Sequence, residues 1–335
     1  MKYFLKSIVW IYLLGATGLQ AQSLEALNKF EPWVQANDPR LPEDSALFHA
    51  LSSDQLDYRG GLIYKADLKE RQQFGGISAM EWIDGALLAF SDFSSTGGVA
   101  QVQQAKWFVL DVETETMSAQ VTRQGYILKE GARLSEIEGV TIRDDQVVFS
   151  LDYSRQLYAG SLSAFDTSQG VAVRASVRIP KARPTEGNFG FEAFTTTTEG
   201  LFFSVYEKRE KKRHHAWLID PTTGSGKALT ICSKLDYIKG ATTLSNGDIV
   251  IIEKSWRKEN NVTDLRISRL HHSDLNNYDI INPQELLRVK SDALDNFEAI
   301  TSFKAGGEEH LLLMSDDNAD GGNAQRTLLL HFVLK

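Results

Sequence analysis

The sequence has very little cysteine and no long apolar run. Cys232 is the single cysteine among 335 residues, so no disulfide bond can form within the chain. No run approaches the roughly 18 consecutive apolar residues of a membrane-spanning helix. No proline- or serine-rich linker divides the chain, which holds only 7 prolines. We therefore expect no integral membrane segment in the mature protein, and its stability must come from core packing or from core packing together with a metal.

The chain also lacks an excess of basic residues. It has 36 Lys and Arg against 44 Asp and Glu, which gives a formal net charge of −8. Because phosphate backbones attract clustered Lys and Arg, this balance excludes nucleic acid as the main partner. The 42% hydrophobic and 24% charged residues are typical of a folded globular protein and exclude a disordered chain.

Several common catalytic motifs are missing. No G-x-S-x-G sequence occurs, so a serine hydrolase with a nucleophile elbow is not supported. Residues 224–227 resemble part of a phosphate-binding loop, but Pro221 occupies the first glycine position. Cys232 has no evident activating partner and is expected to be buried rather than catalytic.

The N-terminus has the pattern of a signal peptide. Lys2 and Lys6 precede a short apolar run at residues 8–16, and Ala21 supplies a small residue for cleavage. We expect residues 1–21 to be removed and the protein to be periplasmic or secreted; the alternative is an uncleaved anchor. Residues 22–50 are expected to be an irregular lead-in, and residues 51–335 to form a single domain.

The rest of the chain repeats a β-hairpin pattern at intervals of about 50 residues. In each segment two β-rich runs flank a turn that carries Gly, Asp or Asn. The segments are residues 74–92, 137–152, 190–207, 238–254 and 296–317, aligned on Gly76, Gly139, Ala193, Gly240 and Ala299.

This repeat predicts an all-β fold, a β-propeller of about six four-stranded blades. No strand follows residues 327–334 in the sequence to pair with them in a hairpin, and no strand precedes residues 62–64 to pair with them. Pairing of these N- and C-terminal strands would close the ring and add a blade to the five hairpins. Five or seven blades are the alternatives within this fold, and a β-sandwich or two β domains are the alternatives to it.

Acidic residues recur at the ends of the hairpin strands. Glu138, Glu192 and Glu298 begin first strands, and further acids end second strands: Asp92, Asp152, Glu207, Glu253 and Asp316. These two positions share one edge of an antiparallel hairpin. Since first strands line the channel of a propeller, the sequence predicts a ring of carboxylates at one channel mouth.

Crowded carboxylates need compensation, because like charges at close range disfavour ionisation. A hard cation such as Ca²⁺ would bind such oxygens, and protonation would remove the charge. Basic side chains would also balance it, and the candidates are Arg133, Arg155, Arg183, Lys254 and Arg266. The bland alternative is that the acids hydrogen-bond to loop amides and order the blades.

An ordered series of short motifs carries a family resemblance. It comprises residues 60–62, 74–78, 87–92, 138–140, 188–193, 295–299 and 315–318. In this order they resemble the phytase-like family, also described as "esterase-like activity of phytase", from about Tyr58 to the C-terminus. The resemblance implies a β-propeller of bacterial envelopes and phosphoester hydrolysis, with calcium as a cofactor. Only residues 37–39 resemble a fragment of the Asp-rich motif of alkaline propeller phytases, so phytate itself is not specified.

Two functions follow. In the first, Glu138, Glu192, Glu298 and Asp316 bind Ca²⁺, with Asp152 and Asp92 as further ligands, and a phosphoester is hydrolysed. The residues expected to orient the water are Glu207, Glu253 and Asp317, and those expected to neutralise the leaving group are Arg155, Arg266 and Lys254. In the second, a non-catalytic propeller uses the acids to bind a structural cation, a ligand or a partner. A sugar or lactone hydrolase on the same scaffold stays open. We expect a monomer that binds a small molecule.

Overall fold

The computed structural model describes residues 24–35, 46–65, 74–92, 105–129, 136–152, 154–167, 170–180, 190–257, 261–317 and 325–335. The predicted signal peptide, Arg133, Arg183 and residues 37–39 lie outside them. The regular secondary structure of the described residues is mostly β-strand, with three short α-helices, which confirms the all-β prediction. None of the helices in these segments is long and apolar enough to cross a membrane.

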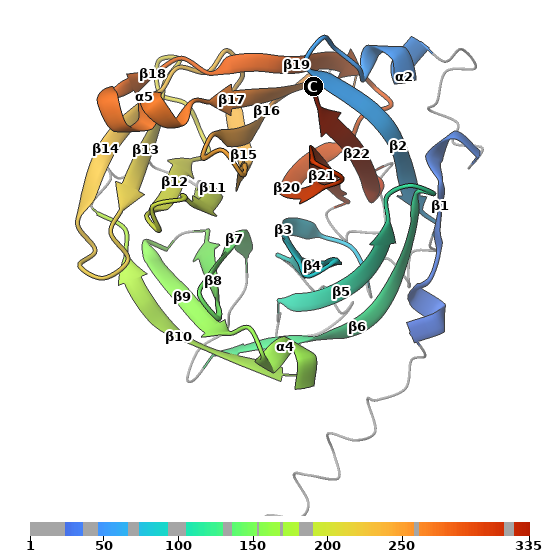
Figure 1. Ribbon diagram of the computed structural model, residues 1–335, viewed down its shortest axis with the longest axis horizontal. Coiled ribbons are helices and arrows are strands. Elements are labelled where there is room, and N and C mark those ends of the chain that lie inside the picture. Colours follow the sequence, from blue (N-terminus) through green and yellow to red (C-terminus); the bar gives the residue numbers. More distant parts are fainter. Residues whose placement is uncertain are drawn as a thin grey trace, which may run out of the picture.

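Strands that are consecutive in the chain pair into antiparallel units around a central axis (Figure 1). The innermost strands are β3 (Ile77–Ile83), β7 (Ile137–Arg143), β11 (Phe191–Thr196), β15 (Tyr237–Thr243) and β20 (Asn296–Ala305). The second strands are β4 (Ala86–Ser91), β8 (Gln146–Leu151), β12 (Phe202–Tyr206), β16 (Ile249–Arg257) and β21 (Glu308–Asp316). Each innermost strand contacts the next around the axis, and β20 contacts β3, so the ring is closed.

The outer strands complete the blades. The third strands are β5 (Lys106–Glu113), β9 (Gln156–Ser161), β13 (His214–Ile219), β17 (Val262–Leu270) and β22 (Leu328–Leu334). The fourth strands are β6 (Ser118–Lys129), β10 (Gly170–Arg178), β14 (Gly226–Ile231), β19 (Gln284–Ser291) and β2 (Leu56–Tyr64). Parallel pairing of β6 with β10 joins the first two blades into one eight-stranded sheet.

Short elements decorate this ring. They are the 3-10 segments at Leu24–Leu27 and Trp33–Gln35, strands β1 (Phe30–Pro32) and β18 (Ile280–Ile281), and helices α2 (Ala46–Ala50), α4 (Ala164–Thr167) and α5 (His272–Asn277). Strand β1 pairs with β2, and β18 pairs in parallel with β14 of the preceding blade. Trp33 and Leu47 pack into the main apolar cluster, so the described parts of the expected lead-in lie against the blades.

The described residues therefore form five blades rather than about six. The expected closure by N- and C-terminal strands is present, since β22 pairs with β2 on one side and with β21 on the other. The count differs because the hairpin β20–β21 is itself the inner half of the closing blade. The prediction of six blades treats that hairpin and the closing strands as separate blades.

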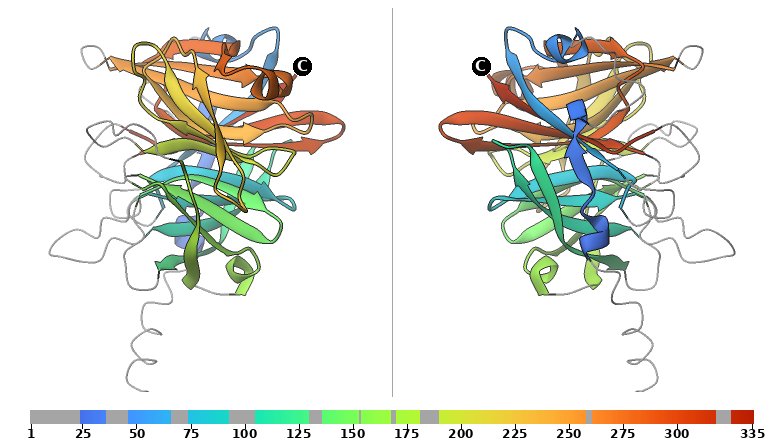
Figure 2. Two further views of the ribbon diagram at one scale, coloured as in Figure 1. Left: turned by 90° about the vertical axis from the view of Figure 1, so that its left-hand side faces the viewer. Right: turned by 90° about the vertical axis from the view of Figure 1, so that its right-hand side faces the viewer.

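Apolar residues fill the seams between neighbouring blades. Five buried clusters lie in the described residues, one at each seam. For example, Val250 and Ile252 of β16 pack with Leu311 and Leu313 of β21 in the seam between the last two blades. Because every blade buries both faces, its second strand contains a near-continuous apolar run, such as residues 249–252 of β16. Figure 2 shows that the hairpin β20–β21 extends further from the ring than its neighbours.

Candidate active site at the acidic mouth

Every innermost strand contains a β-bulge near its start. In each hairpin the register with the second strand shifts by one residue, between Ile77 and Ala79 in β3 and at the same place in the others. The extra residues are Ser78, Glu138, Glu192, Lys239 and Glu298, which we call the entrance ring. Bulges commonly re-aim side chains at barrel rims and active sites.

This register corrects the alignment made from the sequence. The small residues that follow the bulges are Ala79, Gly139, Ala193, Gly240 and Ala299. Gly76 was aligned with them, but Ala79 is the residue at that position. Once the alignment is made on Ala79, Ser78 becomes the first member of the entrance ring, and Lys239 stands where other blades carry Glu.

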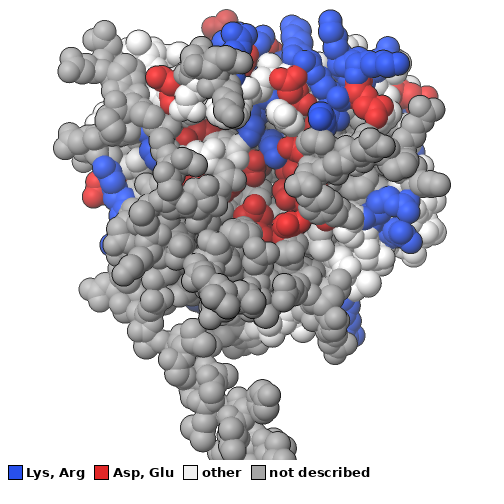
Figure 3. Space-filling model, turned by 180° about the vertical axis from the view of Figure 1, so that it is seen from behind, with Lys and Arg blue, Asp and Glu red and all other residues white. Residues whose placement is uncertain are grey.

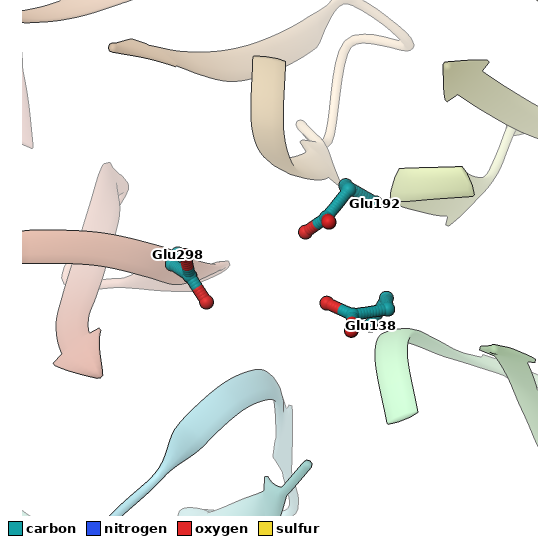
Figure 4. Close-up of side chains that lie close together, drawn as sticks. All are labelled: Glu138, Glu192 and Glu298. Carbon is teal, nitrogen blue, oxygen red and sulfur yellow. The ribbon is translucent and has the colours of Figure 1, made fainter. Parts of the chain in front are cut away.

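The three glutamates of the ring meet as predicted. Oxygen atoms of Glu138, Glu192 and Glu298 all lie within 4.8 Å of one another, and all three side chains are buried. They approach from β7, β11 and β20 and point toward a common centre (Figure 4). Figure 3, which views the face opposite to that of Figure 1, shows acidic side chains gathered in a central hollow. We call this end of the channel the acidic mouth.

Lys239 is the main counter-ion of the cluster. Its Nζ lies 2.6 Å from Glu207 Oε1, 3.0 Å from Glu298 Oε1 and 3.2 Å from Glu192 Oε2. Lys254 Nζ lies 3.7 Å from the same Glu298 oxygen, and Asn296 Nδ2 donates to it at 2.9 Å. The predicted compensation by basic side chains is present, but its largest contributor was not among the predicted residues.

Positions at the ends of the second strands form a return ring beside the entrance ring. In each hairpin, the residue before the bulge pairs with a residue of the second strand, and the next residue along that second strand belongs to the return ring. The members are Asp92, Asp152, Glu207, Lys254 and Asp316. Glu253 was predicted at this position, but Glu253 pairs with Ile238, the residue before the bulge, so Lys254 occupies the return-ring position. The blade β15–β19 thus supplies a lysine to both rings.

Glu253 and Arg266 lie elsewhere, which does not favour catalytic roles for them. Arg266 Nη1 lies 3.1 Å from Glu253 Oε1, and its Nε lies 2.9 Å from Glu285 Oε2. The Ser233 hydroxyl donates to the Glu253 carboxylate. This buried network connects strands of one blade, so the pair fits a structural role.

The remaining predicted residues divide between the cluster and its surroundings. The Asp92 carboxyl interacts electrostatically with Glu298, Glu192 and Lys239 and belongs to the cluster. Asp317 Oδ1 accepts a hydrogen bond from the Gly76 amide at 2.8 Å, so this buried acid orders a loop amide.

Three more candidates lie around that cluster. Asp316 accepts a 3.3 Å hydrogen bond from Asn296, which also binds Glu298. Asp152 lies against Gly190 at the start of the neighbouring blade. Arg155 is half-buried, and its carbonyl oxygen accepts from the Ile179 amide.

Burial and mutual repulsion set the protonation of the cluster. Burial raises the pKa of Glu138 to about 8, with Glu298 and Asp92 adding to the rise and Lys239 opposing it. Burial also raises the pKa of Glu192 and of Asp92. Burial alone would raise the pKa of Glu298 as well, but Lys239 and Lys254 hold it below its usual value. Both protonation and lysine pairing therefore balance the ring.

We expect the protein to lose stability as the pH rises above neutrality in buffer with a chelator. The native state keeps a proton on Glu138 up to a pKa of about 8, whereas an unfolded glutamate releases it near 4.5. Because the native state then binds more protons, the free energy of unfolding falls with rising pH across that window. Urea denaturation between about pH 7.5 and 8.5, where unfolded histidines have largely lost their protons, measures this slope.

Glu138→Gln should flatten that slope, because the amide does not titrate. The control is Glu308→Gln, which changes an exposed carboxyl at the far hairpin tip. Equal slopes for wild type and Glu138→Gln would contradict the assignment of the extra proton to Glu138.

Comparison with known proteins agrees with this architecture. The family model described as "Phytase-like: Esterase-like activity of phytase" matches residues 72–319, which include all five innermost strands. The chain belongs to the phytase-like family. The resemblance noted in the sequence is thereby confirmed. No curated protein matches the chain.

Solved structures similar to this phytase-like chain have very low sequence identity to it. An α-L-arabinofuranosidase of Clostridium thermocellum has a TM-score of 0.51 at 9% identity, with 76% of this chain and 88% of that chain covered. An endo-arabinase of Bacteroides thetaiotaomicron has a TM-score of 0.47 at 10% identity, with 77% and 94% covered. Myxococcus xanthus glutaminyl cyclase has a TM-score of 0.45 at 9% identity, with 82% and 96% covered. The first of these supports the propeller fold and nothing further.

Proposed function

We propose that the acidic mouth is the active site of a phosphoester hydrolase and that it binds a divalent cation such as calcium. The proposal includes export to the periplasm or beyond and action as a monomer. The observation that carries it is the convergence of Glu138, Glu192 and Glu298 within 4.8 Å. An ion with Ca²⁺–oxygen distances of about 2.4 Å can bridge oxygens that far apart.

The charge of the cluster supports a cation alongside Lys239. The carboxyls of Asp92, Glu138, Glu192, Glu207 and Glu298 outnumber the ammonium groups of Lys239 and Lys254. Lys239 forms ion pairs with Glu192, Glu207 and Glu298. The carboxyls of Glu138 and Asp92 are therefore negative charges in excess of this pairing. A cation held by Glu138, Glu192 and Glu298 would take the place of the protons that these buried acids otherwise retain.

The residues around this centre have distinct roles in the proposal. When bound, the cation would polarise the phosphoryl group and lower the pKa of a bound water. Glu207, fixed by its 2.6 Å contact with Lys239, would orient that water. Lys254 would neutralise charge on the leaving oxygen, since it is the return-ring cation beside Glu298. Asn296 holds the carboxylate of Glu298 in place.

Hydrolysis of p-nitrophenyl phosphate tests the proposal, measured with Ca²⁺ and with EDTA. We expect activity that depends on Ca²⁺ and a fall of about 10² or more in kcat/KM for Glu298→Gln, the loss typical of a removed catalytic carboxylate. Glu308→Gln, at an exposed hairpin tip, should retain the wild-type rate. Equal rates in Ca²⁺ and EDTA would remove the cation from the proposal.

The same assay separates two further functions. The convergent carboxyls of the acidic mouth make glycoside hydrolysis by paired carboxyls the second candidate, so p-nitrophenyl α-L-arabinofuranoside forms a second arm. Cleavage of the arabinoside but not the phosphate would overturn the phosphoester proposal. If neither is cleaved while Ca²⁺ raises the melting temperature, the acidic mouth is a structural cation site of a non-catalytic propeller.

A further inference from the structure

The other end of the channel has a different chemistry. A cavity of about 380 Å³ opens there, between the turns of the inner hairpins. Its lining includes Thr195 and Thr196 of β11, Thr242 and Thr243 of β15, and Ser302 of β20. We call this cavity the hairpin mouth. Its volume lies within the range of about 300–1,000 Å³ that is usual for small-molecule sites.

The hydroxyls of the hairpin mouth form a repeating pattern. Two residues beyond the small residue of each bulge stand Glu81, Thr141, Thr195, Thr242 and Thr301. Each of the four threonine hydroxyls hydrogen-bonds to the next blade, to the residue that follows the equivalent position there. For Thr301 this partner is the backbone amide of Trp82 in β3. The links are Thr141 to Thr196 at 3.0 Å, Thr195 to Thr243 at 3.1 Å, Thr242 to Ser302 at 3.0 Å, and Thr301 to the Trp82 amide at 3.0 Å.

Glu81 interrupts this ladder of hydroxyls. In the first blade Glu81 occupies the position that threonine has in the other blades. The residue of the next blade that would be its partner is Ile142, whose side chain cannot form a hydrogen bond. Glu81 Oε2 accepts from the Thr301 hydroxyl at 3.2 Å, and the Glu81 side chain is only partly covered. Burial raises the pKa of Glu81 to about 7, against hydrogen bonds from Thr301 and Thr141. A carboxyl therefore faces the cavity beside hydroxyls that can donate or accept.

The two mouths are separate chambers. Between them the inner strands place an apolar layer of Met80, Val140, Phe194, Ala241 and Ile300. The space within this layer and the entrance ring amounts to about 10 Å³, which is room for one water at most. A ligand at the hairpin mouth consequently cannot reach the acidic mouth.

The charged residues that line the hairpin mouth argue against an anionic ligand. Among the described residues that line the cavity, Glu81 and Asp84 are acidic and none is Lys or Arg, so an anion finds no counter-charge. The wall has an apolar part, since Trp82 stacks on Phe303 with ring centroids 4.1 Å apart and Leu162 lies nearby. Hydroxyls, two carboxyls and an apolar wall match a molecule that has both hydroxyl groups and C–H faces.

We propose that the hairpin mouth binds a neutral polyhydroxylated small molecule such as a monosaccharide or cyclic polyol. The threonine hydroxyls exchange their mutual hydrogen bonds for bonds to the ligand, and Glu81 accepts from a pair of adjacent ligand hydroxyls. The wall at Trp82 packs against the C–H face of the ring. This site is independent of the proposed hydrolase site and does not require it.

Calorimetric titration of the full mature chain with glucose, galactose, arabinose and myo-inositol tests the proposal. We expect saturable binding of at least one of them with a Kd of about 1 mM or lower. Thr195→Val and Thr242→Val should each weaken it about three- to tenfold, the loss expected for one hydrogen bond. Thr230→Val, on the outer strand β14, is the matched control and should bind as wild type does.

Three outcomes overturn the proposal. They are the absence of saturable binding to any of these sugars, equal affinity of the Thr195→Val, Thr242→Val and control variants, and binding of choline or spermidine instead of sugars. If the valine variants do not fold, NMR shifts of the Thr195 and Thr242 methyls on sugar titration into wild type decide the matter. Glu298→Gln should bind the sugar normally, so that failure of the hydrolase proposal and failure of this one are distinguishable.

Discussion

Replacing Lys239 by methionine should cost about 3–5 kcal/mol of unfolding free energy in a chelator buffer, which is the usual loss when one partner of a buried ion pair is removed. Lys239 contacts Glu192, Glu207 and Glu298 and is itself buried, so its removal leaves ionised carboxyls facing one another. The wild type avoids that repulsion by placing one ammonium group between strands from different blades. Urea denaturation with EDTA present measures the loss.

Calcium should restore part of this stability. A cation that binds only the folded state adds about 2.7 kcal/mol at one hundred times its Kd. Without Lys239 the cation competes only with the more distant Lys254, so Ca²⁺ should raise the melting temperature of Lys239→Met more than that of wild type. Lys254→Met is the matched control, since Lys254 makes a longer 3.7 Å contact, and it should lose less.

Two separate results would contradict these expectations. A Lys239→Met variant as stable as wild type in EDTA would show that Lys239 is not the counter-ion that the contacts indicate. Melting temperatures that are identical in Ca²⁺ and EDTA, for wild type and variant alike, would instead remove the cation and leave lysine pairing as the whole compensation.

The second large effect is expected from adding one methyl group to the ring. A Cβ atom at Gly240 would lie 2.4 Å from the carbonyl oxygen of Glu298 in the next blade. Because that oxygen belongs to the backbone of a paired strand, the strain cannot be relieved by turning a side chain. Gly240→Ala should therefore lose about 3 kcal/mol of unfolding free energy, at the upper end of the usual cost of overpacking.

The neighbouring blade offers the control for this prediction. Ala299 occupies the equivalent position in β20 and already accommodates a Cβ atom. Ala299→Gly should cost only about 0.5–1 kcal/mol, the backbone penalty of glycine in a strand. If Gly240→Ala is no less stable than Ala299→Gly, the inner strands are not packed as closely as the structure shows.

Much of the fold could be read from the sequence because hairpin signals are local. Turn residues such as Asn246 and Gly247 mark each hairpin, and an apolar run on either side marks its strands. The blade count was wrong because it depends on which strands pair over long distances. Whether β22 adds to an existing hairpin or starts a new blade is decided by tertiary pairing, which no local pattern records.

The acidic site was predicted in part for a related reason. Glu138 and Glu298 were found because an acid precedes a small residue at both places. The same signal exists at Lys239, which precedes Gly240, but a pattern defined by acidic residues alone does not include a lysine. The same limit explains Glu253, because it is the acid at the end of this strand and the return-ring position one residue further on is a lysine, Lys254.

The placement of β22 has a consequence for how the chain is made. This strand is the last described one in the sequence, yet it lies between β21 and β2 and is hydrogen-bonded on both edges. While the chain is being synthesised, β2 emerges long before β22 and must wait for it with an open edge. Pairing between strands so distant in the sequence makes folding slow and leaves open edges prone to aggregation. The ring can therefore close only after β22 has left the ribosome.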